Sequence, residues 1–241
     1  MSTVDSANKS RVGEVLLRVE DLIVEYKGSR SGAVQAVAGV SFEIKSGETV
    51  AVVGESGCGK SSLAKGVMQL VETKSGKVVL DGTEFSSLKG EELRRARPKM
   101  QMIFQDSVAS LDPHLTVRAL VEQPMKVWHK GTEAERKAKV DELLRSVNLD
   151  PEIVGNRKPT EFSGGQCQRV SIARALSLEP KLLVCDRFAH RRRHHGCSFS
   201  RQIIRNCCRK KISHTDIPHF VMRAELASSF TDEAGTQRIK Q

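Results

Sequence analysis

The segment at residues 49–62, TVAVVGESGCGKSS, constrains the fold more than any other part of the chain. An apolar run at residues 50–53 meets a glycine-rich turn, and a helix-like stretch follows at residues 63–70. The fixed positions match G-x4-G-K-[ST], in the strand, loop and helix order of the phosphate-binding P-loop. A chance glycine-rich turn after a buried strand is the alternative, and the matching context on both sides argues against it. The sequence therefore predicts a nucleotide-binding protein.

Each residue type in this loop suits a bound phosphate. Glycines let backbone N–H groups turn inward and approach phosphate oxygens, and the next helix directs the positive end of its dipole to the same anion. We expect Lys60 to reach the β- and γ-phosphates and the Ser61 hydroxyl to ligate Mg²⁺. The expected nucleotide-binding residues of the loop are Gly54, Glu55, Ser56, Gly57, Cys58, Gly59, Lys60, Ser61 and Ser62.

Composition is that of a globular protein without an obvious membrane segment. The 241 residues are 39% hydrophobic, and no apolar run approaches the about 20 residues of a membrane span. Residues 1–14 are polar and lack a signal-peptide core, so we expect a disordered N-terminus and a cytoplasmic protein. The 6 cysteines show no paired spacing, which favours reduced thiols.

The net charge of +10 is concentrated at one end of the chain. Residues 187–241 carry 12 Lys and Arg against 4 Asp and Glu, whereas residues 1–186 carry 27 against 25. Five of the 7 histidines also lie after residue 186. So abrupt a shift in composition needs an explanation of its own.

Hydrophobic patterning before residue 187 indicates both strands and helices. Strands are expected at residues 15–26, 40–45, 77–80, 100–105 and 182–186. Helices are expected at residues 91–97, at residues 133–147, and after FSGGQ up to residue 178. The helix at 133–147 should bury one face, since its apolar residues follow i, i+3, i+4, i+7 spacing: Val140, Leu143, Leu144 and Val147.

Four elements in a fixed order carry a family resemblance. They are GESGCGKSS, Gln105 within IFQD, FSGGQCQRVSIARAL, and LLVCD. Together they resemble the ATP-binding subunit of an ABC transporter. The stretch MQMIFQDSVASLDPHLTVRALVEQPM is most similar to importers of the oligopeptide, dipeptide and nickel group. The resemblance covers about residues 15–186.

The resemblance implies roles for three residues outside the P-loop. Tyr26 would stack on adenine, although a strand-end tyrosine in the core or at an edge is an alternative. Gln105 would contact Mg²⁺ and the attacking water and would sense the membrane partner; otherwise it is a polar residue at a strand end. Asp186 would be the Walker B carboxylate that holds Mg²⁺, the alternative being a capping aspartate. We therefore expect ATP and Mg²⁺ as cofactors.

The FSGGQ element would act on the ATP of another subunit. In the family it closes over the γ-phosphate bound by the partner, so the working unit is a head-to-tail dimer. Residues at the start of a helix leave free N–H groups that can face an anion. The expected signature residues are Ser163, Gly164, Gly165 and Gln166.

The sequence departs from the family directly after LLVCD. The family has a glutamate there, which positions and polarises the attacking water, and this chain has Arg187. A D-loop should follow, but residues 187–196 contain no acidic residue. The stretch at residues 212–214, Ile-Ser-His, is only a faint echo of the switch-histidine strand. Because positioning is most of what protein contributes to phosphoryl transfer, we expect impaired hydrolysis with ATP binding retained.

The composition of residues 187–241 has three candidate explanations. Nucleic-acid binding would suit the arginines, but no recognisable motif or interleaved aromatic residues accompany them. Zinc binding would need ligands whose spacing matches no common finger: His194, His195, Cys197, Cys207, Cys208 and His214. A slip of reading frame near codon 186 explains the charge shift, the lost periodicity and the missing motifs together. A one-base shift turns CGN arginine codons into codons for Val, Ala, Asp or Gly, and histidine codons into codons for Thr, Ile or Met. RRRHH could thus conceal a sequence such as Val-Asp-Val-Thr-Thr, and we favour the slip.

The expected fold is therefore α/β. A RecA-like P-loop core would carry an antiparallel β portion and an inserted helical subdomain at about residues 106–160, with the C-terminal core strands missing. The nucleotide-binding domain would span residues 15–186, followed by an unfolded basic tail at 187–241.

The expected function is ATP-driven import of peptides across the bacterial inner membrane, at its cytoplasmic face. Partners would be transmembrane permease subunits, a second ATPase, and a periplasmic or lipid-anchored solute-binding protein, without nucleic acid. The alternatives are nickel import, a hydrolysis-defective nucleotide-binding pseudogene product, and a soluble ABC ATPase of DNA repair or translation.

Overall fold

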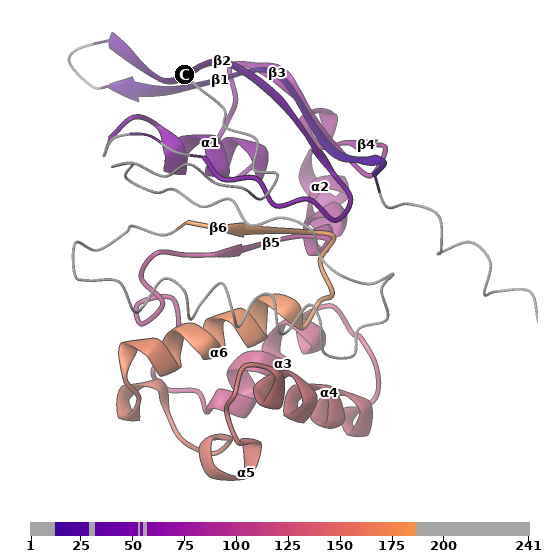
Figure 1. Cartoon of the computed structure of the whole chain (residues 1–241), viewed down its shortest axis with the longest axis vertical. Helices are drawn as coiled ribbons and strands as arrows, with labels where there is room; N and C mark the ends of the chain where they lie inside the picture. The colour runs from indigo at the N-terminus through magenta and orange to yellow at the C-terminus, as the bar shows by residue number, and fades with distance from the viewer. Residues whose placement is uncertain (1–12, 29–31, 53, 55–56, 187–241) are drawn as a thin grey trace, which may run out of the picture. The chain divides into compact units, whose positions relative to one another are not determined.

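The computed structural model describes residues 13–28, 32–52, 54 and 57–186 (Figure 1). Of these, the residues up to Met100 and residues 184–186 form one compact unit, and residues 101–183 form a second. Several predictions lie outside the described residues: the disordered N-terminus up to residue 12, the roles of Glu55, Ser56 and Arg187, and every explanation of the basic tail.

An antiparallel sheet dominates the first unit (Figure 1). Its strands are β1 (Val15–Gly28), β2 (Gly32–Lys45), β3 (Ser75–Leu80) and β4 (Thr83–Glu84), in the order β2-β1-β3-β4. Alternating apolar residues of β1 are buried and form one side of the core: Leu17, Val19, Leu22 and Val24. The expected antiparallel β portion is confirmed.

Strand β2 begins at Gly32, well before the residue 40 that was expected. Residues 32–39, GAVQAVAG, show little alternation because most are small and exposed. They nevertheless pair with the far end of β1, where Gly28 opposes Gly32 and Tyr26 opposes Val34. Pairing with a neighbouring strand, rather than local pattern, extends β2 toward its start.

The expected P-loop strand is only partly formed. Val50 and Val52 are buried, but Ala51 makes an isolated bridge rather than a strand, and Val53 lies outside the described residues. The helix after the loop is present as α1 (Lys60–Val67), and it starts three residues earlier than expected. The first unit also contains α2 (Gly90–Ala96), flanked by short 3-10 turns at Phe85–Ser87 and Arg97–Lys99.

The helices of the second unit are α3 (Val117–Val127), α4 (Glu133–Ser146), α5 (Pro151–Val154) and α6 (Gly164–Leu176). Helix α3 packs against α4 and α6, and α4 also contacts α5 and α6 (Figure 1). The predicted buried face of α4 is confirmed, and α3 was not predicted as a separate helix. A 3-10 turn at Pro159–Glu161 connects α5 to α6.

Two short strands, β5 (Met100–Ile103) and β6 (Leu182–Cys185), pair as a separate sheet, and the division between the units passes through both. The strand expected at residues 100–105 is shorter in the structure, because β5 ends at Ile103. Phe104 and Gln105 are exposed and lie outside the strand. All four residues of β6 are buried, as the apolar run predicted. Among the helices that the structure describes, none is both long and apolar enough to cross a membrane.

Candidate nucleotide-binding site

Ser61 and Asp186, which are 125 residues apart in sequence, meet in the first unit. Ser61 lies in the first turn of α1, and Asp186 directly follows β6. The Ser61 hydroxyl donates a hydrogen bond to Oδ1 of Asp186 at 3.0 Å. The structure therefore brings together two of the three residues that the sequence nominated as Mg²⁺ ligands, whereas the third, Gln105, belongs to the second unit.

The donor chemistry of this pair suits Mg²⁺. Both groups supply oxygen, the donor that this hard cation prefers, and Mg²⁺ is usually held by one or two protein oxygens with water and substrate phosphate completing its octahedron. Within the described ranges no cluster of three or more His, Cys, Asp or Glu side chains could hold a metal by itself. The site therefore fits a cation that is shared with a phosphate, rather than one enclosed by protein.

Gly59 is required by the backbone at the start of α1. Its φ is +88°, in the left-handed region, and a Cβ there would overlap the carbonyl oxygen of Ala36 on β2. Gly59 is the N-cap residue of α1 and has no side chain, so no N-cap side chain occupies the N–H groups of the first turn. These are the donors that a phosphate would accept from.

Lys60 is folded inward over the loop. Its Nζ donates to the carbonyl oxygen of Gly54 at 2.9 Å and lies 3.4 Å from Sγ of Cys58. A side chain at position 54 would also meet that sulfur, since a Cβ there would lie 2.6 Å from Sγ. The ammonium is thus held against Gly54 and Cys58 of the loop to which the sequence assigns the phosphates.

Tyr26 lies beside the first turn of α1. Its hydroxyl donates to Oγ of Ser62 at 3.3 Å, and the residue is 39% exposed. This exposure excludes the core tyrosine that was one alternative for Tyr26. A role in stacking on adenine stays a prediction.

The signature residues open α6 in the second unit. Ser163 is the N-cap, and its hydroxyl accepts from the backbone N–H of Gln166 at 3.4 Å. In return, Oε1 of Gln166 accepts from the Ser163 N–H at 2.9 Å. Ser163, Gly164 and Gly165 are exposed, and a Cβ on either glycine would meet nothing within 4 Å.

The role of Gln166 as a capping residue was missed by sequence reasoning. The signal was present, because Ser-x-x-Gln before an apolar run is the pattern of a capping box. The carbonyl of Ala36 was also missed, and no local signal could have found it. Gln105, which is exposed, lies in the second unit with the signature, whereas Tyr26, the P-loop and Asp186 belong to the first.

The loop, its lysine and the serine–aspartate pair define the P-loop class of nucleotide-binding proteins. A family model described as ABC transporter matches residues 37–188 of the chain. That match covers more than half of the sequence, so the chain belongs to the ABC transporter family.

Several bacterial proteins are similar to this chain. The probable peptide ABC transporter ATP-binding protein y4tS of Sinorhizobium fredii is 42% identical, over 73% of this chain and 51% of its own. The putative oligopeptide transport ATP-binding protein YkfD of Bacillus subtilis is 46% identical, over 71% and 52%. The oligopeptide transport ATP-binding protein OppF of Escherichia coli is 43% identical, over 72% and 54%. The chain thus spans about half the length of the curated relatives that it matches.

Solved structures agree on the fold. The dimeric ATP-binding cassette MJ0796, bound to ADP and Pi in a post-hydrolysis state, has a TM-score of 0.72 and 27% identity, with 88% of each chain covered. The structure of cbiO1 from Clostridium perfringens has a TM-score of 0.70 and 24% identity, and supports the fold alone. The expected P-loop α/β fold is therefore confirmed.

Proposed function

We propose that this chain binds ATP and Mg²⁺ at the first-unit site. The observation that carries the proposal is the 3.0 Å contact between Ser61 and Asp186, which assembles two motifs into one oxygen-lined position beside the P-loop lysine. Lys60 would hold the β- and γ-phosphates, and the N–H groups at the start of α1 would donate to them. Tyr26 would stack on adenine. Mg²⁺, when bound, would neutralise charge on the phosphates.

We further infer a role in peptide import. The three relatives described above are named for peptide or oligopeptide transport, which favours peptides over nickel as the solute. In this role the chain would lie at the cytoplasmic face of the bacterial inner membrane. It would work with permease subunits, a second ATPase and a solute-binding protein, and ATP binding and hydrolysis would close and reopen the ATPase pair.

The signature residues would serve the partner's ATP. Ser163, Gly164 and Gly165 are exposed at the start of a helix, and both glycines leave room for another molecule to approach. The similar cassette MJ0796 is described as dimeric. These observations support a head-to-tail dimer in which α6 of one subunit faces the nucleotide of the other.

Hydrolysis by the chain as written should be slow. Arg187 stands where the family has its catalytic glutamate, so the group that orients water is missing while the phosphate-binding loop is intact. The family match covers residues 37–188, so it ends close to the point where the sequence departs from the family pattern, and this supports a domain that ends near residue 186 and a basic tail of different origin. Resequencing the gene from codon 170 onward tests the reading-frame explanation. A frame that encodes Asp-Glu, a D-loop and a switch histidine would support it, and an unchanged sequence would refute it.

Binding of a fluorescent ATP analogue with Mg²⁺ tests the nucleotide site. Lys60→Ala should abolish binding, because it removes the cation that faces the phosphates, and Ser61→Ala should weaken the dependence of binding on Mg²⁺. Lys65→Ala is the matched control. Lys65 lies in the last turn of the same helix, away from the loop, so this variant should bind the ATP analogue normally. Binding that survives Lys60→Ala would refute the P-loop assignment.

A further inference from the structure

Arg174, in the last turn of α6, contacts the turn that follows Gln105. Its Nη1 donates to the carbonyl oxygen of Ser110 at 2.8 Å. Helix α6 begins at the signature, ten residues before Arg174, so the contact lies about 15 Å along the helix from that end. Arg174 therefore connects the helix that carries the signature to the segment that carries Gln105.

The turn after Gln105 is closed by its own hydrogen bonds. The carboxylate of Asp106 accepts from the N–H of Ala109 at 2.9 Å, and the carbonyl of Asp106 accepts from the N–H of Ser110 at 3.1 Å. The N–H of Leu111 donates to the carbonyl of Val108 at 3.2 Å. These bonds make residues 106–111 a compact unit, so a restraint on Ser110 acts on the whole turn and on Gln105 directly before it.

Ser110 is the point at which this turn is attached to α6. Besides the bond from Arg174, its hydroxyl donates to the carbonyl of Ser107 at 2.9 Å and lies 3.4 Å from the hydroxyl of Ser171 on α6. Ser107 and Ser171 are buried, and so is Leu111, which follows Ser110 in the chain. The attachment is thus a polar contact in a largely buried setting, where a hydrogen bond that is lost is not replaced by water.

Burial of the Arg174 guanidinium beside Ser110 costs solvation free energy. Burial lowers the pKa of Arg174, because it disfavours the charged form. Among the described residues no carboxylate forms an ion pair with Arg174, and its guanidinium donates to the carbonyl oxygen of Ser110. The guanidinium of Arg174 is partly desolvated, and its hydrogen bond to the Ser110 carbonyl offsets part of that cost. This indicates that Arg174 holds the Ser110 carbonyl in place.

We propose that Arg174 is a positioning residue that makes the turn at residues 106–111 move with α6, so that Gln105 and the signature shift together. This inference rests on the proposed function, in which the signature faces the nucleotide of the partner, and on the expected role of Gln105, which would contact Mg²⁺ and the attacking water in its own subunit. With Arg174 removed, the turn would open independently of α6, and Gln105 would lose its fixed relation to the signature.

Hydrogen–deuterium exchange of the full chain, read by mass spectrometry, tests this. Without nucleotide, Arg174→Met should speed exchange of the Ser110 and Leu111 amides about tenfold, the effect of losing one charge-assisted hydrogen bond, and leave residues 163–167 unchanged. Arg174→Lys, which keeps a donor of similar reach, should restore part of the protection. Unchanged exchange at Ser110 and Leu111 in Arg174→Met would overturn the proposal. This result does not depend on whether the chain binds a nucleotide.

A second comparison, with ATP and Mg²⁺ added, separates positioning from simple support. In the unmodified chain, ATP should change amide exchange both at residues 104–111 and at residues 163–167. In Arg174→Met, ATP should still change exchange at residues 163–167 but no longer at residues 104–111. Arg169→Met is the matched control for the turn. Arg169 is also on α6, but it donates to the backbone carbonyls of Asn148 at 3.0 Å and Gly165 at 3.4 Å, so its loss should leave the response of residues 104–111 to ATP unchanged. A turn that responds to ATP equally in Arg174→Met would overturn the proposal. Absent protection at residues 57–62 of the unmodified chain would instead refute the proposed nucleotide site.

Discussion

At the scale of single residues, the P-loop requires glycine for two reasons: a left-handed backbone and the close approach of another backbone group. Gly57 and Gly59 both have left-handed backbones, with φ of +87° and +88°, but only Gly59 faces another backbone group, the Ala36 carbonyl. Gly57→Ala should destabilise the chain by about 1–2 kcal/mol through backbone strain alone. Gly59→Ala should lower the free energy of unfolding by clearly more, measured by urea denaturation, and should abolish ATP binding. Equal effects of the two substitutions would show that the Ala36 contact is unimportant.

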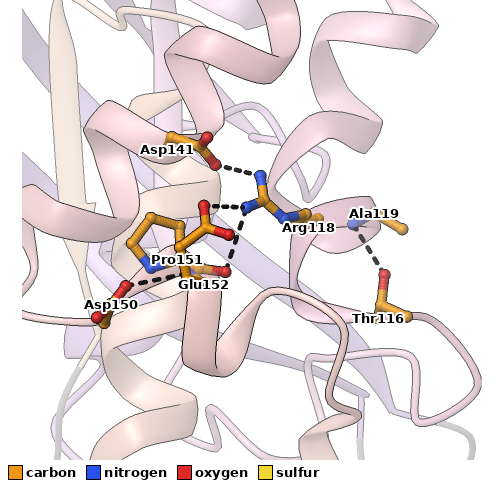
Figure 2. Close-up of polar contacts among 7 residues, drawn as sticks. All are labelled: Thr116, Arg118, Ala119, Asp141, Asp150, Pro151 and Glu152. Atoms are coloured by element: carbon orange, nitrogen blue, oxygen red, sulfur yellow. Dashed lines mark hydrogen bonds and ion pairs between the residues drawn. The ribbon is translucent and has the colours of Figure 1, made fainter.

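At the scale of elements, Arg118 joins three helices of the second unit (Figure 2). From the first turn of α3 its guanidinium pairs with Asp141 on α4 and donates to the Pro151 carbonyl of α5 at 3.2 Å. The Arg118 N–H donates to the carbonyl of Gly155 at 3.0 Å, which fixes the turn after α5 as well. Glu152 also approaches, at 3.4 Å, but from an exposed position. This cluster holds the chain segment that leads to the signature.

Two carboxylates of this cluster should therefore differ in their contribution to stability. Asp141→Asn should lower the free energy of unfolding by about 1–3 kcal/mol, because the Asp141 side chain is only 16% exposed and the partly buried Arg118 is left with the exposed Glu152 as its remaining carboxylate partner. Glu152→Gln is the matched control, and with a side chain 76% exposed it should change stability by less than about 1 kcal/mol. Urea denaturation of both variants measures the difference, and a larger effect at Glu152 would contradict this account.

At the scale of the whole molecule, the hydrolytic half of the family pattern is absent from the sequence after residue 186. Arg187→Glu should therefore fail to restore brisk ATP turnover, because the D-loop and the switch histidine are missing as well. Phosphate release from the full chain measures this, with the Lys60→Ala, Arg187→Glu double variant as the background. Brisk turnover in the single variant would show that the remaining elements are present or are not needed.

The sequence by itself determined the elements whose signals are local. The P-loop helix, the alternating strand β1, the buried face of α4 and the start of α6 each depend on residues within a few positions of one another, where backbone propensity and side-chain spacing act directly. The four ordered motifs likewise determined the family. The same reasoning failed at residues 32–39, where small residues carry little periodicity. It also missed α3, although the buried residues Val117, Leu120, Val121 and Met125 follow helical spacing, in a stretch interrupted by Pro124.

Only the tertiary structure decided the contacts between distant residues. It paired residues 32–39 with β1, placed the Ala36 carbonyl against Gly59, joined Ser61 to Asp186, and attached the turn after Gln105 to α6 through Arg174. Each of these contacts depends on how strands and helices pack, and no spacing within one segment encodes it. Local physical chemistry therefore sets which residues can bind a nucleotide, and packing sets which of them meet.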